Sequence, residues 1–219
     1  MTIIAPRSRL LTLVPVLPFT GLTIAYVATN SATPHPDASG AAVLAYTTAH
    51  QDLIHLGAFL LLLSAAPLVL ATGLLHRALR APAIAVMGGA LAASGLTLSA
   101  LFSWTGARLP SSAATESARA FADLAFLTGG PAYAAGFGLL ALGLSIPVLM
   151  DTELPRWVGI FGLVIAGAAA LSTLALVASG FTYLLPVVRF GGLIWLICTA
   201  VVVSRRASFP TESALPAHV

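Results

Sequence analysis

Residues 47–75 of the chain read TTAHQDLIHLGAFLLLLSAAPLVLATGLL, and beyond Asp52 this stretch contains no acidic or basic residue apart from His55. A helix needs about 20 mainly apolar residues to cross the hydrocarbon core of a bilayer, so the stretch predicts a transmembrane helix. The whole chain has the same character, because 58% of its 219 residues are hydrophobic and 8% are charged. Soluble domains carry roughly 25% charged residues. We therefore expect an integral membrane protein with the lipid bilayer as its first partner.

Six segments are long and apolar enough to cross a bilayer: about 10–29, 47–75, 83–105, 120–149, 157–179 and 184–204. Short stretches rich in Pro, Gly and Ser separate them, as is typical of turns. None of these linkers is long enough to divide the chain into two domains. The sequence thus predicts an all-α, six-helix transmembrane bundle formed by residues 1–219. We expect the first segment to be a span, not a cleaved signal peptide, because its apolar run exceeds a typical signal core and no Ala-x-Ala site follows.

Arginines near the ends of the spans predict the orientation, because cytoplasmic loops are enriched in basic residues. With six spans, Arg108 and Arg119 lie on one side. Seven arginines lie on the other side: Arg7, Arg9, Arg77, Arg80, Arg156, Arg205 and Arg206. Both termini are therefore expected in the cytoplasm. Since orientation accounts for the net charge of +3, no nucleic-acid partner is expected.

Composition and motifs exclude several classes of activity. The chain has no lysine, which excludes a retinal or pyridoxal Schiff base and a phosphate-loop lysine. Cys198 is its single cysteine, so it cannot form an intramolecular disulfide or a thiolate zinc cluster. A His-Glu-x-x-His helix, a Gly-x-Ser-x-Gly elbow with its histidine and a nucleotide-binding glycine loop are also absent. No cofactor can be named from the sequence.

The fourth segment is longer than a bilayer requires. From Ser117 to Met150 a straight helix would measure about 50 Å at 1.5 Å per residue. We expect its beginning to lie at the outer membrane interface, with a kink at Gly129-Gly130-Pro131. Small residues at a spacing of four predict close helix packing, within the bundle or in a homodimer: Gly88 and Ala92, then Gly95, Ser99 and Ser103, and Gly162, Ala166 and Ala170.

Ionisable residues lie near the starts of three predicted spans, and such residues in a membrane segment are candidates for a functional site. If helices two, four and six all run inwards, these groups share a depth near the outer leaflet. We expect Arg189 to pair with Asp52 or Asp123, with His55 beside them, and Tyr133 to lie at the entrance. The candidate ligand-binding set is His50, Asp52, His55, Arg119, Asp123, Tyr133 and Arg189.

Three hypotheses account for this cluster. It could bind a small or lipid-like molecule in an outward-facing pocket, or assist its passage. It could instead only hold helices together, in a structural or regulatory subunit of a membrane complex or a homo-oligomer. It could also serve a membrane enzyme. A metal site is not expected, because no second helix supplies a histidine at that depth. The first hypothesis is preferred, and no residue is assigned a catalytic role.

Two further stretches resemble a known family. They are GLLHRALR at residues 73–80 and LPRWVGIFG at residues 154–162. The stretch from about 47 to 179 resembles small multi-pass bacterial membrane proteins that are catalogued as a domain of unknown function. This resemblance implies a helical bundle in the bacterial cytoplasmic (inner) membrane, and it assigns no catalytic residues.

Overall fold

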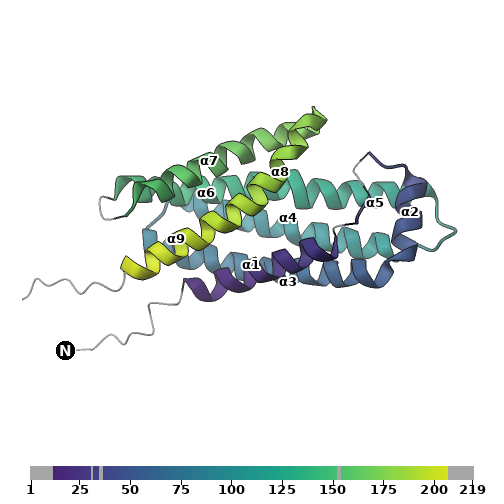
Figure 1. Cartoon of the computed structure of the whole chain (residues 1–219), viewed down its shortest axis with the longest axis horizontal. Coiled ribbons are helices and arrows are strands. Elements are labelled where there is room, and N and C mark those ends of the chain that lie inside the picture. Colours follow the sequence, from purple (N-terminus) through teal and green to yellow (C-terminus); the bar gives the residue numbers. More distant parts are fainter. Residues whose placement is uncertain (1–11, 31, 35–36, 152–153, 207–219) are drawn as a thin grey trace, which may run out of the picture.

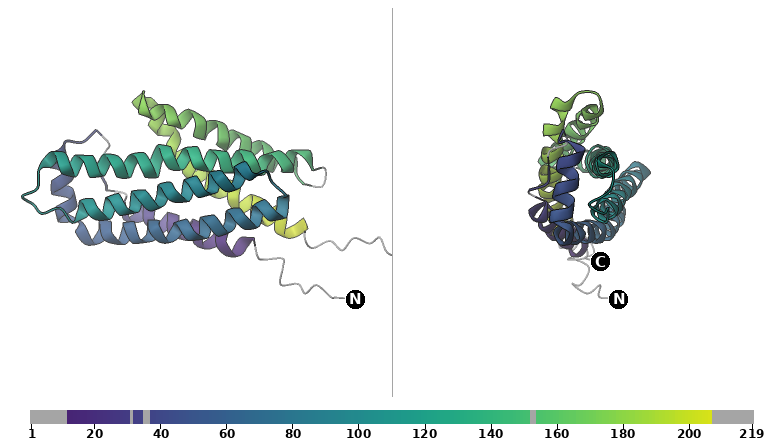
Figure 2. Two further views of the ribbon diagram at one scale, coloured as in Figure 1. Left: turned by 180° about the vertical axis from the view of Figure 1, so that it is seen from behind. Right: turned by 90° about the vertical axis from the view of Figure 1, so that its right-hand side faces the viewer.

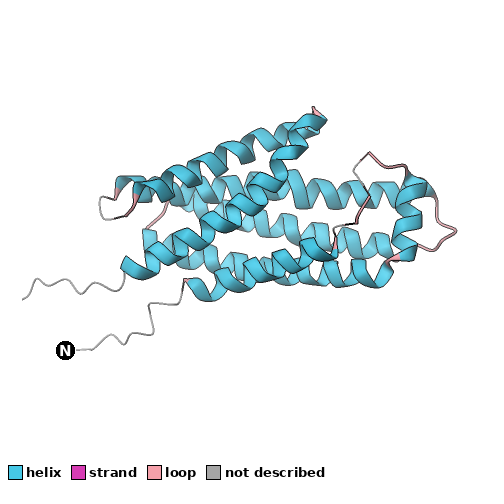
Figure 3. Cartoon of the chain, in the orientation of Figure 1, coloured by secondary structure: helices cyan, strands magenta, loops and turns pink. Residues whose placement is uncertain are grey.

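A computed structural model describes residues 12–30, 32–34, 37–151 and 154–206, and within these ranges the chain forms helices and no strand (Figures 1 and 3). The α-helices are α1 (Leu13–Thr29), α2 (Gly40–Ala49), α3 (Gln51–Leu79), α4 (Ala83–Ala107), α5 (Thr115–Leu127), α6 (Tyr133–Met150), α7 (Arg156–Ser172), α8 (Leu184–Pro186) and α9 (Gly192–Arg206). Shorter helical segments lie between them. The π-helical segments are η2 (Thr128–Ala132) and η5 (Val187–Gly191), and the 3₁₀ segments are η3 (Thr173–Leu176) and η4 (Ser179–Tyr183).

Five helical stretches are long and apolar enough to cross a membrane: Gln51–Leu79, Ala83–Ala107, Thr115–Met150, Arg156–Leu176 and Ser179–Arg205. The protein is therefore a helical multi-pass membrane protein, as the sequence predicts. Helix α1 has 17 described residues and packs along α3. The first two residues of the expected span 10–29, like Arg7 and Arg9, lie outside the described ranges.

The long helices lie side by side along the long axis of the molecule (Figure 2). Helices α1, α4 and α7 run in one direction, while α3, the α5–η2–α6 stretch and the last helix run in the other (Figure 1). Helix α1 contacts α9, and the hydroxyls of Thr12 and Ser204 are 2.7 Å apart. The beginning of α1 and the end of α9 therefore lie at the same end of the bundle.

Small residues bring α4 and α6 into close contact. A Cβ atom on Gly88 would meet the backbone of Leu140, and one on Gly143 would lie 2.7 Å from the backbone nitrogen of Ala85. Gly162 of α7 likewise faces Trp195, whose indole N–H donates to the Val158 carbonyl at 3.0 Å. The predicted small-residue packing on α4 and α7 thus occurs within the bundle, where close backbone approach increases van der Waals contact.

Large apolar side chains cover the outside of the bundle. Met87 is 69% exposed, Leu70 is 61% exposed and Ile194 is 57% exposed. Exposed apolar surface of this extent is unfavourable in water but is matched by lipid tails. This outer surface is therefore suited to a bilayer.

The second predicted span has the wrong beginning. Residues 47–49 belong to a separate helix, α2, which lies across the end of the long helices (Figures 1 and 2). The side chain of Ser39 caps α2 by accepting a hydrogen bond from the Ala42 amide at 3.3 Å, and the lack of a side chain at Gly40 lets α2 approach Thr115. The chain turns at His50 and continues as α3 to Leu79.

The fourth predicted span is part of a longer helical stretch. Residues Thr115–Met150 form 36 continuous helical residues, so α5 extends the expected span 120–149 at its beginning. Its π-helical segment η2 includes Gly129, Gly130 and Pro131, the residues expected to form a kink. A second π-helical segment, η5, occurs near the start of the last long stretch. π-helical turns are rare and occur frequently at functional sites.

Candidate functional site

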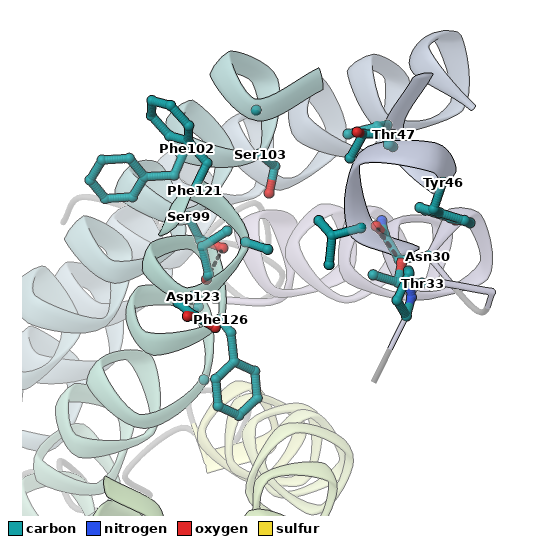
Figure 4. A pocket seen from close by; sticks show the side chains of 18 of the residues that line it. Asn30, Thr33, Tyr46, Thr47, Ser99, Phe102, Ser103, Phe121, Asp123 and Phe126 are labelled. Carbon is teal, nitrogen blue, oxygen red and sulfur yellow. Dashed lines mark hydrogen bonds between the residues drawn. The ribbon is translucent and has the colours of Figure 1, made fainter. Parts of the chain in front are cut away.

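A cavity of about 420 Å³ lies near the end of the bundle that α2 covers. Its lining residues come from α1, α2, α3, α4, α5, η2, the α8–η5 region and the connection between α1 and α2. In Figure 4, Ser99, Ser103 and Phe126 lie across the cavity from Asn30 and Thr33. The polar lining consists of Tyr26, Asn30, Thr33, Tyr46, Thr47, Ser99, Ser103, Arg119, Asp123 and Arg189. Large apolar lining side chains include Ile54, Phe102, Phe121, Phe126, Leu185 and Phe190.

Arg119 and Asp123 form an ion pair on one face of α5. The Arg119 Nε is 2.9 Å from one carboxylate oxygen of Asp123, and both side chains are partly exposed. Residues four apart on a helix lie on the same face, which brings the two groups together. Arg119 also donates a hydrogen bond to the Ala38 carbonyl, just before α2. Arg119 therefore connects α5 to the segment that leads into α2.

Arg189 has a different environment from the predicted one. Its guanidinium donates a hydrogen bond to the Gly129 carbonyl and lies 5.2 Å from the ring centre of Tyr133 and 5.7 Å from that of Tyr26. It forms no ion pair with any described carboxylate. The expected pairing with Asp52 or Asp123 was wrong, because Asp123 pairs with Arg119 and Asp52 lies elsewhere.

The two π-helical segments meet at this hydrogen bond. Gly129 belongs to η2 and Arg189 to η5, and both residues line the cavity. The absence of a side chain at Gly129 matters here, because a Cβ atom would collide with the hydroxyl of Ser99. Ser99 itself donates to the Ala125 carbonyl at 2.8 Å. This part of the cavity is therefore lined by Ser99 of α4, Gly129 of η2 and Arg189 of η5.

Tyr133 lies behind the cavity wall, not at an entrance. It is 3% exposed, and its ring packs against Phe137 with ring centres 5.6 Å apart. Its hydroxyl is buried and has no hydrogen-bond partner among the described residues. Leaving a buried hydroxyl unsatisfied costs about 1–3 kcal/mol.

The three candidate residues near the start of α3 lie outside the cavity. His50 is exposed and its ring stacks on Tyr46 at 4.4 Å, and Asp52 is exposed at the first turn of α3. His55 packs against Trp104 with ring centres 5.9 Å apart, and its buried Nε2 has no hydrogen-bond partner among the described residues. The predicted single cluster is thus divided into two groups.

Arg189 also lies at a different depth from the start of α3. The Gln51 side chain donates to the Ala107 carbonyl at 2.7 Å, which places the start of α3 beside the end of α4. Arg189 bonds to Gly129, which lies beside Ser99. Eight residues separate Ser99 from Ala107, or about 12 Å along an α-helix. The expectation of one common depth was therefore wrong.

Several cavity residues were not predicted as site residues. Asn30 follows the last residue of α1, and its side-chain amide donates to the Tyr26 carbonyl at 3.0 Å. Ser99 and Ser103 were predicted only as packing residues. A polar residue directly after a span and serines four apart were the signals available, although each is common in membrane helices.

No described group of three or more His, Cys, Asp or Glu residues could hold a metal ion. The cavity instead offers two guanidiniums, one carboxylate, several hydroxyls and aromatic side chains. Such a set suits a molecule that has a polar and an apolar part. No protein-family model, curated protein or solved structure matches the chain.

Proposed function

We propose that the protein binds a small amphipathic or lipid-like molecule in the cavity of Figure 4, or assists its passage through the membrane. The observation that carries this proposal is the cavity itself. Its volume of about 420 Å³ falls within the range of small-molecule sites, roughly 300–1,000 Å³. Its lining combines charged groups with phenylalanine and leucine side chains, as an amphipathic ligand requires.

We further propose six spans, with α1 as the first, and both termini in the cytoplasm of a bacterium. Support comes from the arginines at the end of the bundle where α1 begins and α9 ends: Arg77, Arg80, Arg156 and Arg205. Basic residues favour the cytoplasmic side. The cavity lies toward the opposite end, so it would face outwards from the cytoplasmic membrane. The bacterial inner membrane itself rests on the resemblance of residues 47–179 to the uncharacterised family.

A structural role is the main alternative, and the Arg119–Asp123 pair with its bond to Ala38 favours it for α5 and α2. That pair does not account for the cavity. Catalysis is less well supported, because the described carboxylate in the cavity, Asp123, is already paired with Arg119. A general base would need a free or poised group within reach of the substrate.

Native mass spectrometry of the gently extracted protein tests the proposal. We would compare the wild type with Ser103→Phe, which places a ring in the cavity, and with the control Ser94→Phe, an exposed position on the same helix. We expect a stoichiometric adduct in the wild type and in Ser94→Phe, and its loss in Ser103→Phe. An unmodified mass in all three proteins, or an adduct that survives in Ser103→Phe, would contradict binding in this cavity.

A further inference from the structure

The two arginines of the cavity differ in how their charge is compensated. The Arg119 guanidinium pairs with the Asp123 carboxylate and also bonds to the Ala38 carbonyl. Arg189 has one hydrogen bond, to the Gly129 carbonyl, and no described carboxylate pairs with it. A guanidinium has five N–H donors. Arg189 therefore brings an uncompensated positive charge and further donor capacity to the cavity.

This charge lies well inside a membrane-spanning stretch. Arg189 is the eleventh residue of the stretch Ser179–Arg205, and its side chain is half-buried. A charged residue in such a position is costly and normally pairs with a group of opposite charge or lines a polar pathway. The rings of Tyr26 and Tyr133 contribute cation–π attraction, which is weaker than a charge-assisted hydrogen bond.

We infer that Arg189 binds the anionic headgroup, a carboxylate or a phosphate, of a single-chain amphiphile. This inference rests on the proposed function and specifies the chemistry of its ligand. The planar guanidinium can donate two parallel hydrogen bonds to the oxygens of either headgroup. The Gly129 bond and the two tyrosine rings hold the guanidinium in position beforehand, which reduces the entropy lost when the ligand binds.

Apolar side chains beside Arg189 provide a path for the alkyl chain. Phe126, Leu185 and Phe190 line the same cavity. Phe190 follows Arg189 directly and is 44% exposed, so the lining continues to the outer surface of the bundle. The methyl end of Leu185 lies beside Gly130, where a Cβ atom would be 3.2 Å away. An alkyl chain placed along these residues would extend from the Arg189 guanidinium towards the lipid.

The test uses the purified full-length protein in a neutral detergent and four probes. Hexadecanoate and hexadecyl phosphate carry the two anionic headgroups, 1-hexadecanol has the same chain without charge, and inorganic phosphate has no chain. Binding is measured by native mass spectrometry and by titration calorimetry. The variants are Arg189→Gln and, as a control, Arg108→Gln, whose arginine stacks on Trp104 and does not line the cavity.

We expect the wild type to bind one or both anionic amphiphiles at least 10-fold more tightly than 1-hexadecanol. Arg189→Gln should lose this preference, with an affinity about 10- to 100-fold lower, as is usual when a hydrogen bond to a charged group is removed. Arg108→Gln should bind like the wild type. Comparing the two anionic probes identifies the preferred headgroup. If Arg189→Gln fails to fold, the headgroup preference of the wild type still provides the test.

Three results would overturn the inference in different ways. Equal binding of 1-hexadecanol and the anionic probes would refute the role of Arg189 but leave the proposed binding of an amphipathic molecule in place. Tight binding of inorganic phosphate, without binding of the amphiphiles, would mean that the ligand of Arg189 is a free anion and not an amphiphile. Binding of none of the four probes, together with an unmodified mass of the extracted protein, would refute both the inference and the proposed function.

Discussion

The guanidinium of Arg189 donates a hydrogen bond to the backbone carbonyl of Gly129, and this bond joins two π-helical segments that are 60 residues apart in the sequence. A π-helical turn shifts the backbone hydrogen bonds from the i→i+4 to the i→i+5 pattern. Such irregular backbone within a membrane protein is tolerated where it is buried in protein or lines a cavity. Here both segments contribute residues to the same cavity. The bond thus fixes the relative position of η2 and η5.

Substitution of Gly129 should disturb this contact. In Gly129→Ala the new methyl group would collide with the side chain of Ser99. We expect the free energy of unfolding to fall by about 1–3 kcal/mol, as in other overpacked sites, and the apparent Tm in detergent to fall with it. Gly130→Ala is the matched control, because its methyl group would press only on the flexible end of Leu185 and would meet Phe126 at an ordinary van der Waals distance of 3.8 Å. We expect a smaller loss for this neighbour.

A double mutant isolates the clash. Ser99→Gly removes the colliding atoms but also loses the hydrogen bond to Ala125, so the single variant should be less stable than the wild type. The loss in the double variant should be smaller than the sum of the two single losses, by about 1 kcal/mol or more. Additive losses would contradict a clash between the new methyl group at position 129 and the Ser99 side chain.

The packing of α4 against α6 leads to a second prediction. A Cβ atom at Gly136 would collide with the backbone of Ala92, which cannot move aside as a side chain can. Gly136→Ala should therefore lower the apparent Tm strongly and reduce the yield of folded protein. Gly167→Ala has open space around it and should leave the Tm within about 1 °C or raise it, since alanine favours a helix. Equal effects at both sites would contradict the close contact.

The Arg119–Asp123 pair should have a modest effect on stability. Both side chains are partly exposed, and ion pairs at such positions contribute about 0.2–1 kcal/mol. We expect Asp123→Asn to lower the free energy of unfolding by less than about 1 kcal/mol. Arg119→Gln should cost more, because it also loses the bond to Ala38 that connects α5 to the segment before α2. If Asp123→Asn lowered the free energy of unfolding more than Arg119→Gln, the result would contradict the expected contribution of the bond to Ala38.

The sequence predicted the membrane helices because their signal is local. A long apolar run such as Leu56–Leu75 can hardly be anything else, and the small residues on α4 carry a spacing that favours packing. The Arg119–Asp123 pair could also have been predicted, because its spacing of four is a helical pairing pattern. Our expectation that Arg189 would pair with Asp52 or Asp123 ignored the nearer partner of Asp123.

Other features depend on contacts between distant parts of the chain. Helix α2 is only ten residues long, and its position follows from its contact with Thr115, which lies 75 residues further along the chain than Gly40. The π-helical segment η2 packs against α4, and the Arg189 bond connects it to η5. No spacing in the sequence indicates that the Gly129 carbonyl can accept from Arg189. The cavity combines these features, so it could not be placed from the sequence.

The proposed topology can be tested with cysteine labelling. In a Cys198→Ala background, Ser112→Cys places a thiol in the exposed connection between α4 and α5, and Arg156→Cys places one at the exposed start of α7. Intact cells should react with a membrane-impermeant maleimide at position 112 and not at position 156. Permeabilised cells should react at both. Labelling of position 156 alone in intact cells would invert the proposed orientation, and labelling of both positions would mean that the stretch from α5 to α6 does not cross the membrane.

The hydroxyl of Tyr133 provides the last prediction. It is buried and has no described hydrogen-bond partner, and the ring lies beside the Arg189 guanidinium. Tyr133→Phe removes an unsatisfied polar group, so the ligand-free protein should keep its apparent Tm or gain up to about 1 kcal/mol of stability. Saturation with hexadecanoate should leave this gain unchanged, because Tyr133 lies behind the cavity wall and does not line the cavity. Tyr183→Phe, at a residue that is 79% exposed, serves as the control and should change neither Tm. A lower Tm for Tyr133→Phe without ligand would mean that the hydroxyl already has a partner within the protein.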